Sequence, residues 1–351
     1  MTVREVEPLP VAIVGCGHLG TYHARVYART PGCRVVAVVD SDPHKAQKLA
    51  AELSCDALQT IDSLPGRVAA ASIATPTTTH EEVALPLLAG GVDLLIEKPL
   101  AADSAAGARV VAAARKAGRT LAVGQIERCN PAFLVARREL RTPQFIESHR
   151  LATFVPRSLD VDVILDLMIH DLDLVLSLVQ SPVEAIDAVG VSVITDGADI
   201  ANARLRFADG RVANLTASRV SRQRMRKIRF FERSRYVSID LNARKVDVIR
   251  LSRASGFAPP GEPGHGTGAQ APLPPEAAML AAKGLALSHE TIDVSEGDAL
   301  ENEIEAFLAG CRGLGPVAVD GEAGLKSLDL ALQVRAAVAR SVERLGDLDS
   351  R

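Results

Sequence analysis

The segment from Val161 to Val179 holds the residues whose types and spacing most directly suggest chemistry. It is apolar nearly all round a helix, and five of its polar side chains recur at intervals of four, four, three and four residues: Asp162, Asp166, His170, Asp173 and Ser177. This spacing predicts one stripe along a helix. Because an unpaired buried polar group costs about 1 to 3 kcal/mol, we expect the stripe to line a cavity that holds something polar.

A glycine-rich loop near the start predicts a dinucleotide site. The sequence G-C-G-H-L-G follows the apolar run 9–14 and opens a helical stretch at 21–30. Its first glycine allows a tight turn, its second lets the backbone approach a pyrophosphate, and its third lets the helix pack closely. The alternative is an ordinary turn. The loop residues expected at the cofactor are Gly15, Cys16, Gly17, His18, Leu19 and Gly20.

An acidic residue after the next apolar run indicates which dinucleotide binds. Asp40 lies twenty residues beyond Gly20 and directly follows the run 33–39. A carboxylate there accepts hydrogen bonds from the adenosine ribose and repels a 2′-phosphate, and Ser41 follows it in place of an arginine. We therefore expect NAD rather than NADP. In the alternative interpretation, Asp40 is a solvated strand end.

Further polar residues follow later apolar runs, at the edge of a parallel sheet where open α/β folds bind ligands. Lys98 follows the run 94–96 within Glu97-Lys98-Pro99, and the alternative is a surface lysine paired with Glu97. The segment 74–80 opens a helix, so its hydroxyls and His80 either serve that helix or face the cofactor. The residues expected at the cofactor from these segments are Thr75, Pro76, His80, Glu97, Lys98 and Gln125.

Alternating strands and helices must position these residues. Apolar runs at 9–14, 33–39, 69–74, 93–96 and 121–123 are separated by helical stretches at 21–30, 80–89 and 105–117. This alternation predicts a doubly wound parallel sheet, in a dinucleotide-binding Rossmann domain of residues 1–127.

The rest of the chain, residues 128–351, predicts an α+β domain that binds substrate and mediates oligomerisation. A helix at 131–140 is followed by strands at 145–153, 183–194, 201–207, 212–218, 227–232, 235–240 and 246–251, with Asp209-Gly210 at a hairpin. We expect a large, mainly antiparallel open-faced sheet with helices on one face. Closing helices at 299–308 and 322–345 are expected to pack across both domains.

Composition excludes several classes of protein. The 351 residues favour two domains, and a net charge of −3 gives no global reason to expect nucleic acid or a membrane surface. No apolar run reaches the length of a membrane span. Five scattered cysteines show neither disulfide nor metal spacing, so a reducing cytoplasm is expected.

Two further segments have a distinctive composition. Residues 252–276 are rich in glycine and proline and predict a mobile loop. Basic residues are concentrated between 219 and 235. We favour a strand that is solvated or contacts another subunit over a nucleic-acid site, and contact with a diphosphate is a further alternative. The basic residues are Arg219, Arg222, Arg224, Arg226, Lys227, Arg229, Arg233 and Arg235.

The order of these motifs resembles the Gfo/Idh/MocA oxidoreductase family. The glycine loop, A-T-P-T-T-T-H, E-K-P and D-L-M-I-H-D-L-D occur in that order, and residues 319–332 are similar to the family's closing segment. The resemblance implies a catalytic set of Lys98, Asp166 and His170. It also implies that subunits pair through the open sheet face, as a homodimer or homotetramer.

A narrower resemblance concerns G-Q-I-E-R-C-N-P at residues 124–131. With the striped helix, it is similar to the UDP-N-acetylglucosamine 3-dehydrogenase subgroup, although Cys129 stands where phenylalanine is expected. The implied substrate is a nucleotide-linked sugar whose 3-hydroxyl becomes a ketone. The side chains expected to bind it are Lys98, Arg128, Asn130, Asp166 and His170.

These residues predict oxidation of a secondary sugar alcohol. Removing a hydride from carbon yields a ketone only if the hydroxyl proton leaves, so His170 is the expected base. Lys98 is expected to stabilise negative charge on the oxygen and Asp166 to orient His170 or bind a sugar hydroxyl, with Asp173 in support and Asp171 structural. The alternatives are a metal site, disfavoured because the stripe has one histidine, an inositol or free-sugar dehydrogenase, and a non-catalytic NAD-sensing regulator.

Overall fold

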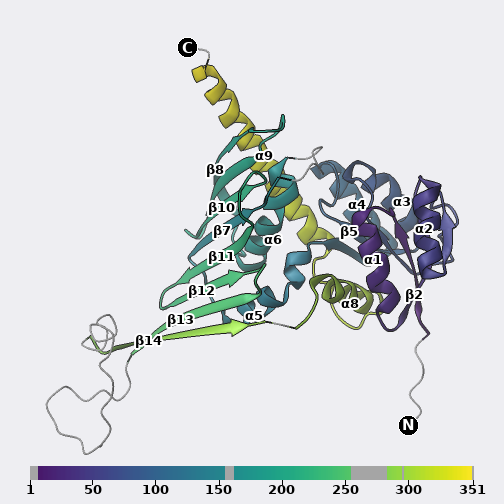
Figure 1. Cartoon of the computed structure of the whole chain (residues 1–351), viewed down its shortest axis with the longest axis horizontal. Helices are drawn as coiled ribbons and strands as arrows, with labels where there is room; N and C mark the ends of the chain where they lie inside the picture. Colours follow the sequence, from purple (N-terminus) through teal and green to yellow (C-terminus); the bar gives the residue numbers. More distant parts are fainter. Residues whose placement is uncertain (1–6, 155–161, 254–282, 295, 350–351) are drawn as a thin grey trace, which may run out of the picture.

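Two sheets organise the chain in the computed structural model, which describes residues 7–154, 162–253, 283–294 and 296–349 (Figure 1). The first sheet is wholly parallel and has the strand order β3-β2-β1-β4-β5-β6. Its strands are β1 (Leu9–Val14), β2 (Cys33–Val39), β3 (Asp56–Leu58), β4 (Ala70–Ile73), β5 (Asp93–Glu97) and β6 (Leu121–Gly124). This order reverses direction beside β1, where the carboxyl ends of the strands leave a crevice for a dinucleotide. The predicted Rossmann architecture is confirmed.

Helices cover both faces of this sheet. They are α1 (His18–Arg29), α2 (Pro43–Leu53), α3 (His80–Ala89) and α4 (Ser104–Ala117), with the short 3-10 turns η1 (Thr77–Thr79) and η2 (Ile126–Cys129). Local signals explain their ends: Asp42 and Asp103 accept backbone N–H groups at the starts of α2 and α4, and Gly118 ends α4 in the left-handed region at φ 60°. Neither α2 nor β3 was predicted from the sequence.

The second sheet has eight strands in the order β14-β13-β12-β11-β7-β10-β9-β8. Every neighbouring pair is antiparallel except β7 and β10. The strands are β7 (Phe145–Leu151), β8 (Val183–Val191), β9 (Ile200–Phe207), β10 (Val212–Ser218), β11 (Met225–Glu232), β12 (Arg235–Asp240), β13 (Lys245–Arg253) and β14 (Leu285–Asp293). The expected mainly antiparallel sheet is therefore confirmed.

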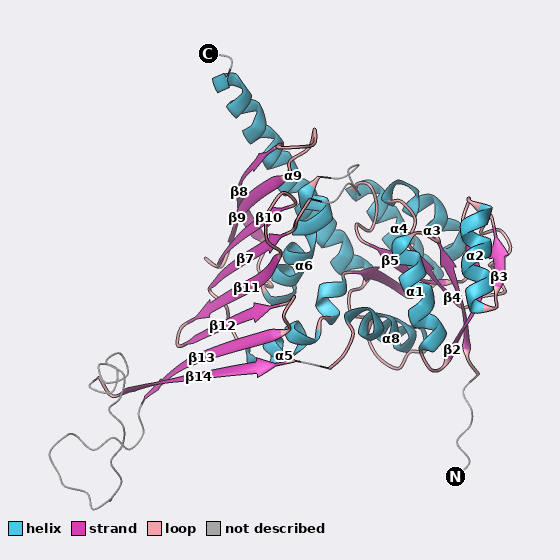
Figure 2. Cartoon of the chain, in the orientation of Figure 1, coloured by secondary structure: helices cyan, strands magenta, loops and turns pink. Residues whose placement is uncertain are grey.

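Helices of the described chain cover one face of this sheet, the face turned toward the Rossmann domain (Figure 2). They are α5 (Pro131–Glu139), the π-helical turn η3 (Ile164–Met168), α6 (Ile169–Leu178) and α9 (Gly321–Asp349). On the other face lie the Glu147–Arg229 ion pair and a row of rings formed by Phe145, Phe231 and Tyr236.

The last two helices tie the domains together. Helix α8 (Ala299–Cys311) buries Ile304, Phe307 and Leu308 against residues of β1, α1 and β2. Helix α9 contacts α4 and β6 as well as α6 and β8, so it spans from one sheet to the other. The C-terminal part of the chain thereby completes the hydrophobic core of the N-terminal domain.

Two sequence expectations need correction. The mobile loop was expected from residue 252, but Ser252 and Arg253 belong to β13, where they pair with β14. The rest of the predicted loop, up to residue 276, lies outside the described residues. Strand β14, which begins at Leu285, was not predicted from the sequence. The polar stripe was expected on a regular α-helix, whereas its first part is the π-helical turn η3, in which the Ile169 N–H donates to the Ile164 carbonyl.

Candidate functional site

The predicted cofactor residues meet at one edge of the parallel sheet. The glycine loop follows β1, Asp40 follows β2, Thr75 follows β4, and Gln125 follows β6. Because these strands are parallel, their carboxyl ends lie along the same edge. Lys98 follows β5 at this edge, on the side that faces the second domain.

The glycine loop has the shape that a pyrophosphate requires. Gly15 adopts φ +96°, and a Cβ there would lie 2.6 Å from the Ala74 carbonyl oxygen. A Cβ on Gly20 would collide with the Gly15 carbonyl, whereas the space beside Gly17 is open to 4 Å. No side chain caps the start of α1, so its first N–H groups can bind an anion. The loop therefore fits a dinucleotide, in agreement with the role predicted for each glycine.

Asp40 supports the loop directly. Its carboxylate accepts the Cys16 N–H at 2.8 Å through Oδ2 and the Asp42 N–H at 2.9 Å through Oδ1. Each carboxylate oxygen has a second lone pair, so Asp40 can still accept hydrogen bonds from ribose hydroxyls. Beside the loop lies a cavity of about 370 Å³ between α1 and α2. Its lining includes Cys16, Gly17, His18, Thr21, Tyr22, Lys45 and Lys48.

The other predicted cofactor residues differ in their surroundings. His80 is buried, and its two ring nitrogens lie 3.0 Å from the carbonyl oxygens of Pro99 and Thr75. Through these two contacts His80 links the loop after β4 to the loop after β5. Gln125 is buried, but its Oε1 has no hydrogen-bond partner among the described residues, so it remains available to a ligand.

Glu97, the last residue of β5, links Lys98 to helix α1. Its Oε1 lies 2.7 Å from His23 Nε2, and its Oε2 accepts the Lys98 N–H at 3.2 Å. Burial alone would raise the pKa of Glu97, but the hydrogen bond and charge of His23, together with Lys98, lower it. His23 was not predicted as a site residue, because nothing in the sequence shows that a residue on α1 contacts one on β5.

The Lys98 ammonium group reaches the second domain. Its Nζ donates to the Asp166 carbonyl oxygen at 2.8 Å and lies 3.4 Å from Asp166 Oδ1. Asp166 lies within η3, and π-helical turns of this kind are common at functional sites. Both side chains keep partial exposure, 15% for Lys98 and 27% for Asp166. Two of the three predicted catalytic residues are therefore in direct contact across the domain boundary.

His170 follows one turn later and remains available for chemistry. Its Nδ1 is buried with no hydrogen-bond partner in the described part of the chain, while the side chain as a whole is partly exposed. Burial lowers the pKa of His170 well below its ordinary value, and the positive charges of Lys98, Arg150 and Arg226 lower it further. The imidazole is therefore neutral near pH 7 and can accept a proton.

The ends of the stripe serve the fold rather than a cavity. Asp162 accepts the N–H groups of Ile164 and Leu165, and the Ser177 hydroxyl donates to the Leu174 carbonyl. Asp173 is buried, and its carboxylate accepts hydrogen bonds from Arg128 and Ser327. Asp162, Asp173 and Ser177 therefore have partners within the protein, whereas Asp166 and His170 combine partial exposure with a place near Lys98.

Two buried ion-pair groups stiffen this region. Arg150 of β7 donates to both carboxylate oxygens of Asp171 at 2.9 Å and to Glu127 at 2.7 Å. Asp171 is thus structural, as its position round the helix predicted. Arg128 donates to Asp173 at 2.6 Å. These pairs fix α6 against β7 and η2, so the position of His170 is determined from both sides.

The two predicted substrate residues outside the catalytic set make internal contacts. Arg128 is engaged by Asp173, with 13% of its side chain exposed. Asn130 accepts the Ala132 N–H at the start of α5, and its amide donates to Glu127 at 2.9 Å. In the structure both side chains therefore have partners within the protein, and their role in substrate binding stays a prediction.

Helix α8 adds a buried acid that the sequence analysis missed. Both carboxyl oxygens of Glu303 are buried without a hydrogen-bond partner among the described residues. Burial raises the pKa of Glu303 well above its ordinary value, and the charges of Glu97 and Asp173 raise it further.

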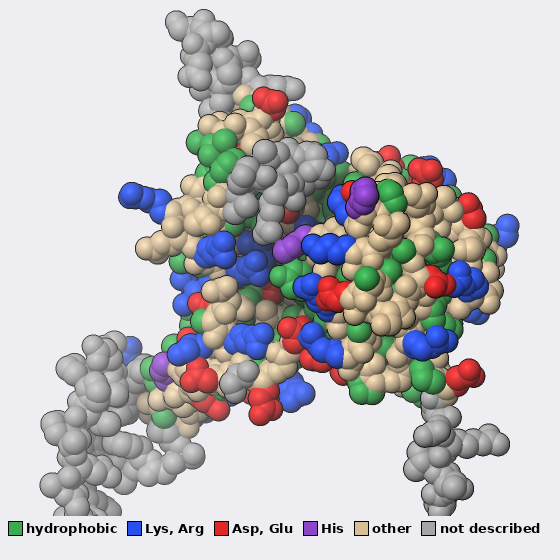
Figure 3. Space-filling view, turned by 45° about the vertical axis from the view of Figure 1, so that its right-hand side comes forward, with side chains coloured by type: hydrophobic (Ala, Val, Ile, Leu, Met, Phe, Trp, Pro, Cys, Tyr) green, Lys and Arg blue, Asp and Glu red, His purple; other side chains and the backbone are tan. Residues whose placement is uncertain are grey.

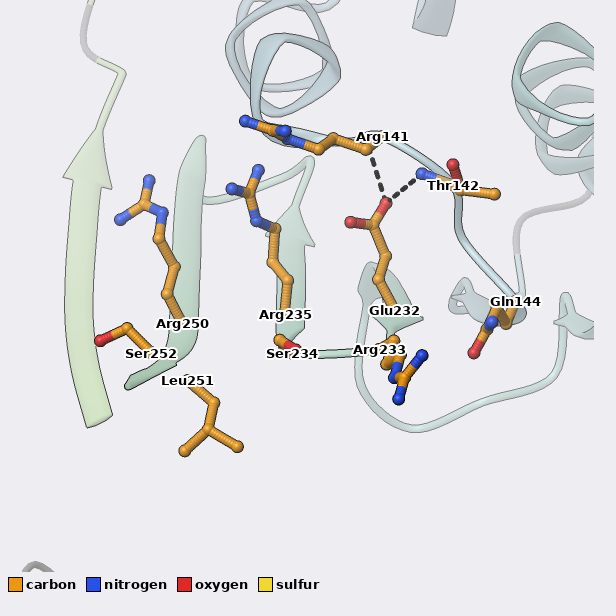
Figure 4. A pocket seen from close by; sticks show the side chains of 10 residues that line it. All are labelled: Arg141, Thr142, Gln144, Glu232, Arg233, Ser234, Arg235, Arg250, Leu251 and Ser252. Carbon is orange, nitrogen blue, oxygen red and sulfur yellow. Dashed lines mark hydrogen bonds between the residues drawn. The ribbon is translucent and has the colours of Figure 1, made fainter. Parts of the chain in front are cut away.

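Other possible sites carry less chemistry. Burial raises the pKa of Cys16 to about 12, so its thiol is a poor nucleophile, and no group of three or more metal-ligating side chains is found in the described chain. None of the helices searched in this structure is both long and apolar enough to span a bilayer. A separate cavity of about 480 Å³ lies at the ends of β11, β12 and β13, among Arg141, Glu232, Arg233, Arg235 and Arg250 (Figure 4).

Comparison with known proteins assigns both domains. Residues 9–125 match the model of an oxidoreductase family with an NAD-binding Rossmann fold, and residues 111–234 match the GFO/IDH/MocA C-terminal domain. The NAD cofactor predicted from the glycine loop and Asp40 is thereby confirmed.

Individual relatives extend the similarity along the chain. A UDP-N-acetylglucosamine 3-dehydrogenase from Acidithiobacillus ferrooxidans is 39% identical over 95% of this chain and 98% of its own. The solved structure of that enzyme superposes with a TM-score of 0.82, covering 95% of this chain and 99% of the other at 37% identity. An inositol 2-dehydrogenase from Saccharopolyspora erythraea is 34% identical over 49% of this chain and 54% of its own. The chain therefore belongs to the Gfo/Idh/MocA family of NAD-binding oxidoreductases.

Proposed function

We propose that this protein oxidises the 3-hydroxyl of UDP-N-acetylglucosamine to a ketone, with NAD as the hydride acceptor. The observation that carries the proposal is the meeting of Lys98 and Asp166 beside His170, at the carboxyl edge of an NAD-binding sheet. The 39% identity with a UDP-N-acetylglucosamine 3-dehydrogenase over 95% of the chain supports the choice of sugar.

The residues divide the work of the reaction. The glycine loop and Asp40 would hold NAD, which would supply the acceptor for the hydride of carbon 3. The Lys98 ammonium group binds the reacting oxygen and stabilises the negative charge that develops there. His170 takes the hydroxyl proton, since its imidazole is neutral and its side chain is partly exposed one helical turn after Asp166. One proton reaches the histidine, one hydride leaves carbon, and the C–O bond becomes a ketone.

Asp166 acts by positioning. Its carbonyl and carboxylate oxygens hold the Lys98 ammonium group, and the π-helical turn presents both to the facing domain. Buried ion pairs on the helix that follows, Arg150 with Asp171 and Arg128 with Asp173, keep the turn in place. Preorganised charges of this kind need little rearrangement as the reaction proceeds.

A free polyol such as inositol is the second candidate substrate. The similarity to an inositol 2-dehydrogenase over 49% of the chain favours it, because the same three residues can oxidise any well-placed secondary alcohol. A regulator that only senses NAD is the third candidate. The joint presence of Lys98, Asp166 and His170 in one constellation argues against that role.

We also propose that the protein assembles as a homodimer or homotetramer through the outer face of the eight-stranded sheet. In the described chain the helices leave this face uncovered, and Phe231 is 36% exposed there beside Phe145 and Tyr236. Sedimentation of the purified protein measures the subunit number, and a monomer would contradict the assembly.

A substrate panel tests the proposed function. Nucleotide sugars and free polyols are incubated with NAD, and formation of NADH is followed by absorbance, with His170→Ala as the inactive control. We expect UDP-N-acetylglucosamine to be oxidised at least tenfold more efficiently than any free sugar. Oxidation of inositol alone would support the second candidate, and the absence of NADH with every alcohol would support the regulator.

A further inference from the structure

Arg226 occupies an unusual position on strand β11. Side chains alternate along a strand, so Arg226 shares the face of Ile228 and Phe230, both fully buried under the helices. At the start of the strand this cover ends, and 52% of the Arg226 side chain is exposed. A long cationic side chain is thus placed on the inner face of the sheet yet open to solvent.

The neighbours of Arg226 place it at the catalytic site. It pairs in register with Arg150 on β7, and its Nη1 lies 3.4 Å from Glu127 Oε1. Arg150 in turn is bonded to Asp171, the residue after His170, and the charges of Arg226, Arg150 and Lys98 all lower the pKa of His170. Lys98 belongs to the Rossmann domain and Arg226 to the opposite sheet. The reacting site therefore has a cationic group on each wall.

Carboxylates neutralise only part of this charge. Asp171 and Glu127 both pair with Arg150, and Glu127 is 2.7 Å from Arg150 but 3.4 Å from Arg226. Two more arginines, Arg222 and Arg224, are exposed just before β11, and no carboxylate of the described chain pairs with either. The charge of Arg224 also lowers the pKa of Arg226, behind burial and Arg150, so these cations are close neighbours. Figure 3 shows Lys and Arg side chains on both sides of a histidine in the recess between the two domains.

We propose that Arg226, assisted by Arg224, binds the diphosphate of a nucleotide-linked sugar and thereby selects such sugars over free ones. The inference rests on the proposed function of the same site and adds the residue that sets its specificity. With the sugar ring between Lys98 and His170, the diphosphate extends toward the start of β11. The planar guanidinium group of arginine can make two parallel hydrogen bonds to phosphate oxygens. At Arg150 the N–H donors are used by Asp171 and Glu127, whereas Arg226 makes one contact of 3.4 Å with Glu127 and keeps donors for a ligand.

The test compares three variants with the wild type. Arg226→Met removes the charge and keeps an unbranched chain, Arg226→Lys keeps the charge without the planar group, and Arg138→Met is the matched control. Arg138 is an exposed arginine on α5. Two quantities are measured: KM and kcat for UDP-N-acetylglucosamine, and the affinities of the NADH-bound protein for UDP and for uridine, by calorimetry.

We expect Arg226→Met to raise KM and weaken UDP binding by about 10- to 100-fold, the loss of a charge-assisted bidentate contact. Its kcat and its affinity for uridine should stay within about threefold of the wild type, since the reacting groups are untouched. Arg226→Lys should recover part of the loss, and Arg138→Met should match the wild type. A merely structural role would instead weaken uridine and UDP binding alike.

The outcomes separate this inference from the proposed function. If UDP-N-acetylglucosamine is oxidised but Arg226→Met binds UDP as the wild type does, the inference is wrong and the function stands. If UDP binding depends on Arg226 but no UDP-sugar is oxidised, the function is wrong and the diphosphate site stands. Should Arg226→Met fail to fold because Glu127 loses a partner, Arg224→Gln decides, since it leaves that contact intact; unchanged UDP affinity in Arg224→Gln would then overturn the inference.

Discussion

Replacing Lys98 by methionine removes the ammonium group from the site and keeps an unbranched side chain. The Nζ atom lies 2.8 Å from the Asp166 carbonyl oxygen and 3.4 Å from its carboxylate, so its position is fixed. Of the other cations that act on His170, Arg150 is paired with Asp171 and Glu127, and Arg226 lies on the opposite sheet, so neither stands where Lys98 does. We therefore expect kcat to fall about 100- to 1000-fold, the cost of removing one donor to a developing oxyanion.

The same substitution shifts the pH profile. The charge of Lys98 lowers the pKa of His170, second only to burial, so its removal raises that pKa. Because the base must be unprotonated, the low-pH limb of kcat/KM should move to higher pH. The affinity for NADH should fall far less than kcat does. The sequence contains no tryptophan, so the fluorescence of NADH itself reports this affinity without interference from that residue.

Lys116→Met, on the exposed surface of α4, is the matched control and should behave as the wild type. Turnover of Lys98→Met within threefold of the wild type would refute the role of Lys98 in stabilising the oxygen. A low-pH limb that stays in place or moves to lower pH would refute the electrostatic coupling between Lys98 and His170, whatever the loss in kcat.

Three other substitutions test separate parts of the account. His170→Ala should lower kcat about 100- to 10,000-fold with NADH affinity intact, and a loss confined to KM would contradict its role as base. Asp40→Ala should weaken NAD binding about tenfold and improve the relative use of NADP, whereas Asp42→Ala, which uncaps α2, should not; an unchanged NAD to NADP preference would exclude the ribose contact. Glu303→Gln should stabilise the protein more at pH 8 than at pH 5. The raised pKa of Glu303 makes the folded state bind the extra proton, so stability falls as pH rises above the unfolded value of about 4.3, and a gain in melting temperature equal at both pH values would contradict this.

The parallel sheet was predictable because its signals are local. Five of its six strands are short apolar runs, and Gly15 and Gly20 stand where a Cβ would collide with backbone atoms. The missed strand β14 shows the opposite case. It lies at the edge of its sheet with most of its residues exposed, so its sequence carries no apolar alternation.

The catalytic set was predictable in part for the same reason. The spacing of Asp166 and His170 indicated one face of a helix, and Lys98 was placed by the strand before it. The sequence did not reveal the π-helical turn, which depends on how η3 packs. Nor did it reveal the partners of Arg128 and Arg150, because those ion pairs join residues 45 and 21 positions apart.

Isotope transfer tests the central claim most directly. UDP-N-acetylglucosamine carrying deuterium on carbon 3 is incubated with NAD and the protein, with hydroxylamine present to trap the ketone, and the NADH is analysed by mass spectrometry. We expect NADH heavier by one deuterium from this substrate, unlabelled NADH from sugar labelled on carbon 4, and NADH formation about 100- to 10,000-fold slower with His170→Ala. Unlabelled NADH from the carbon-3 substrate, or NADH formed only from free polyols, would contradict this claim.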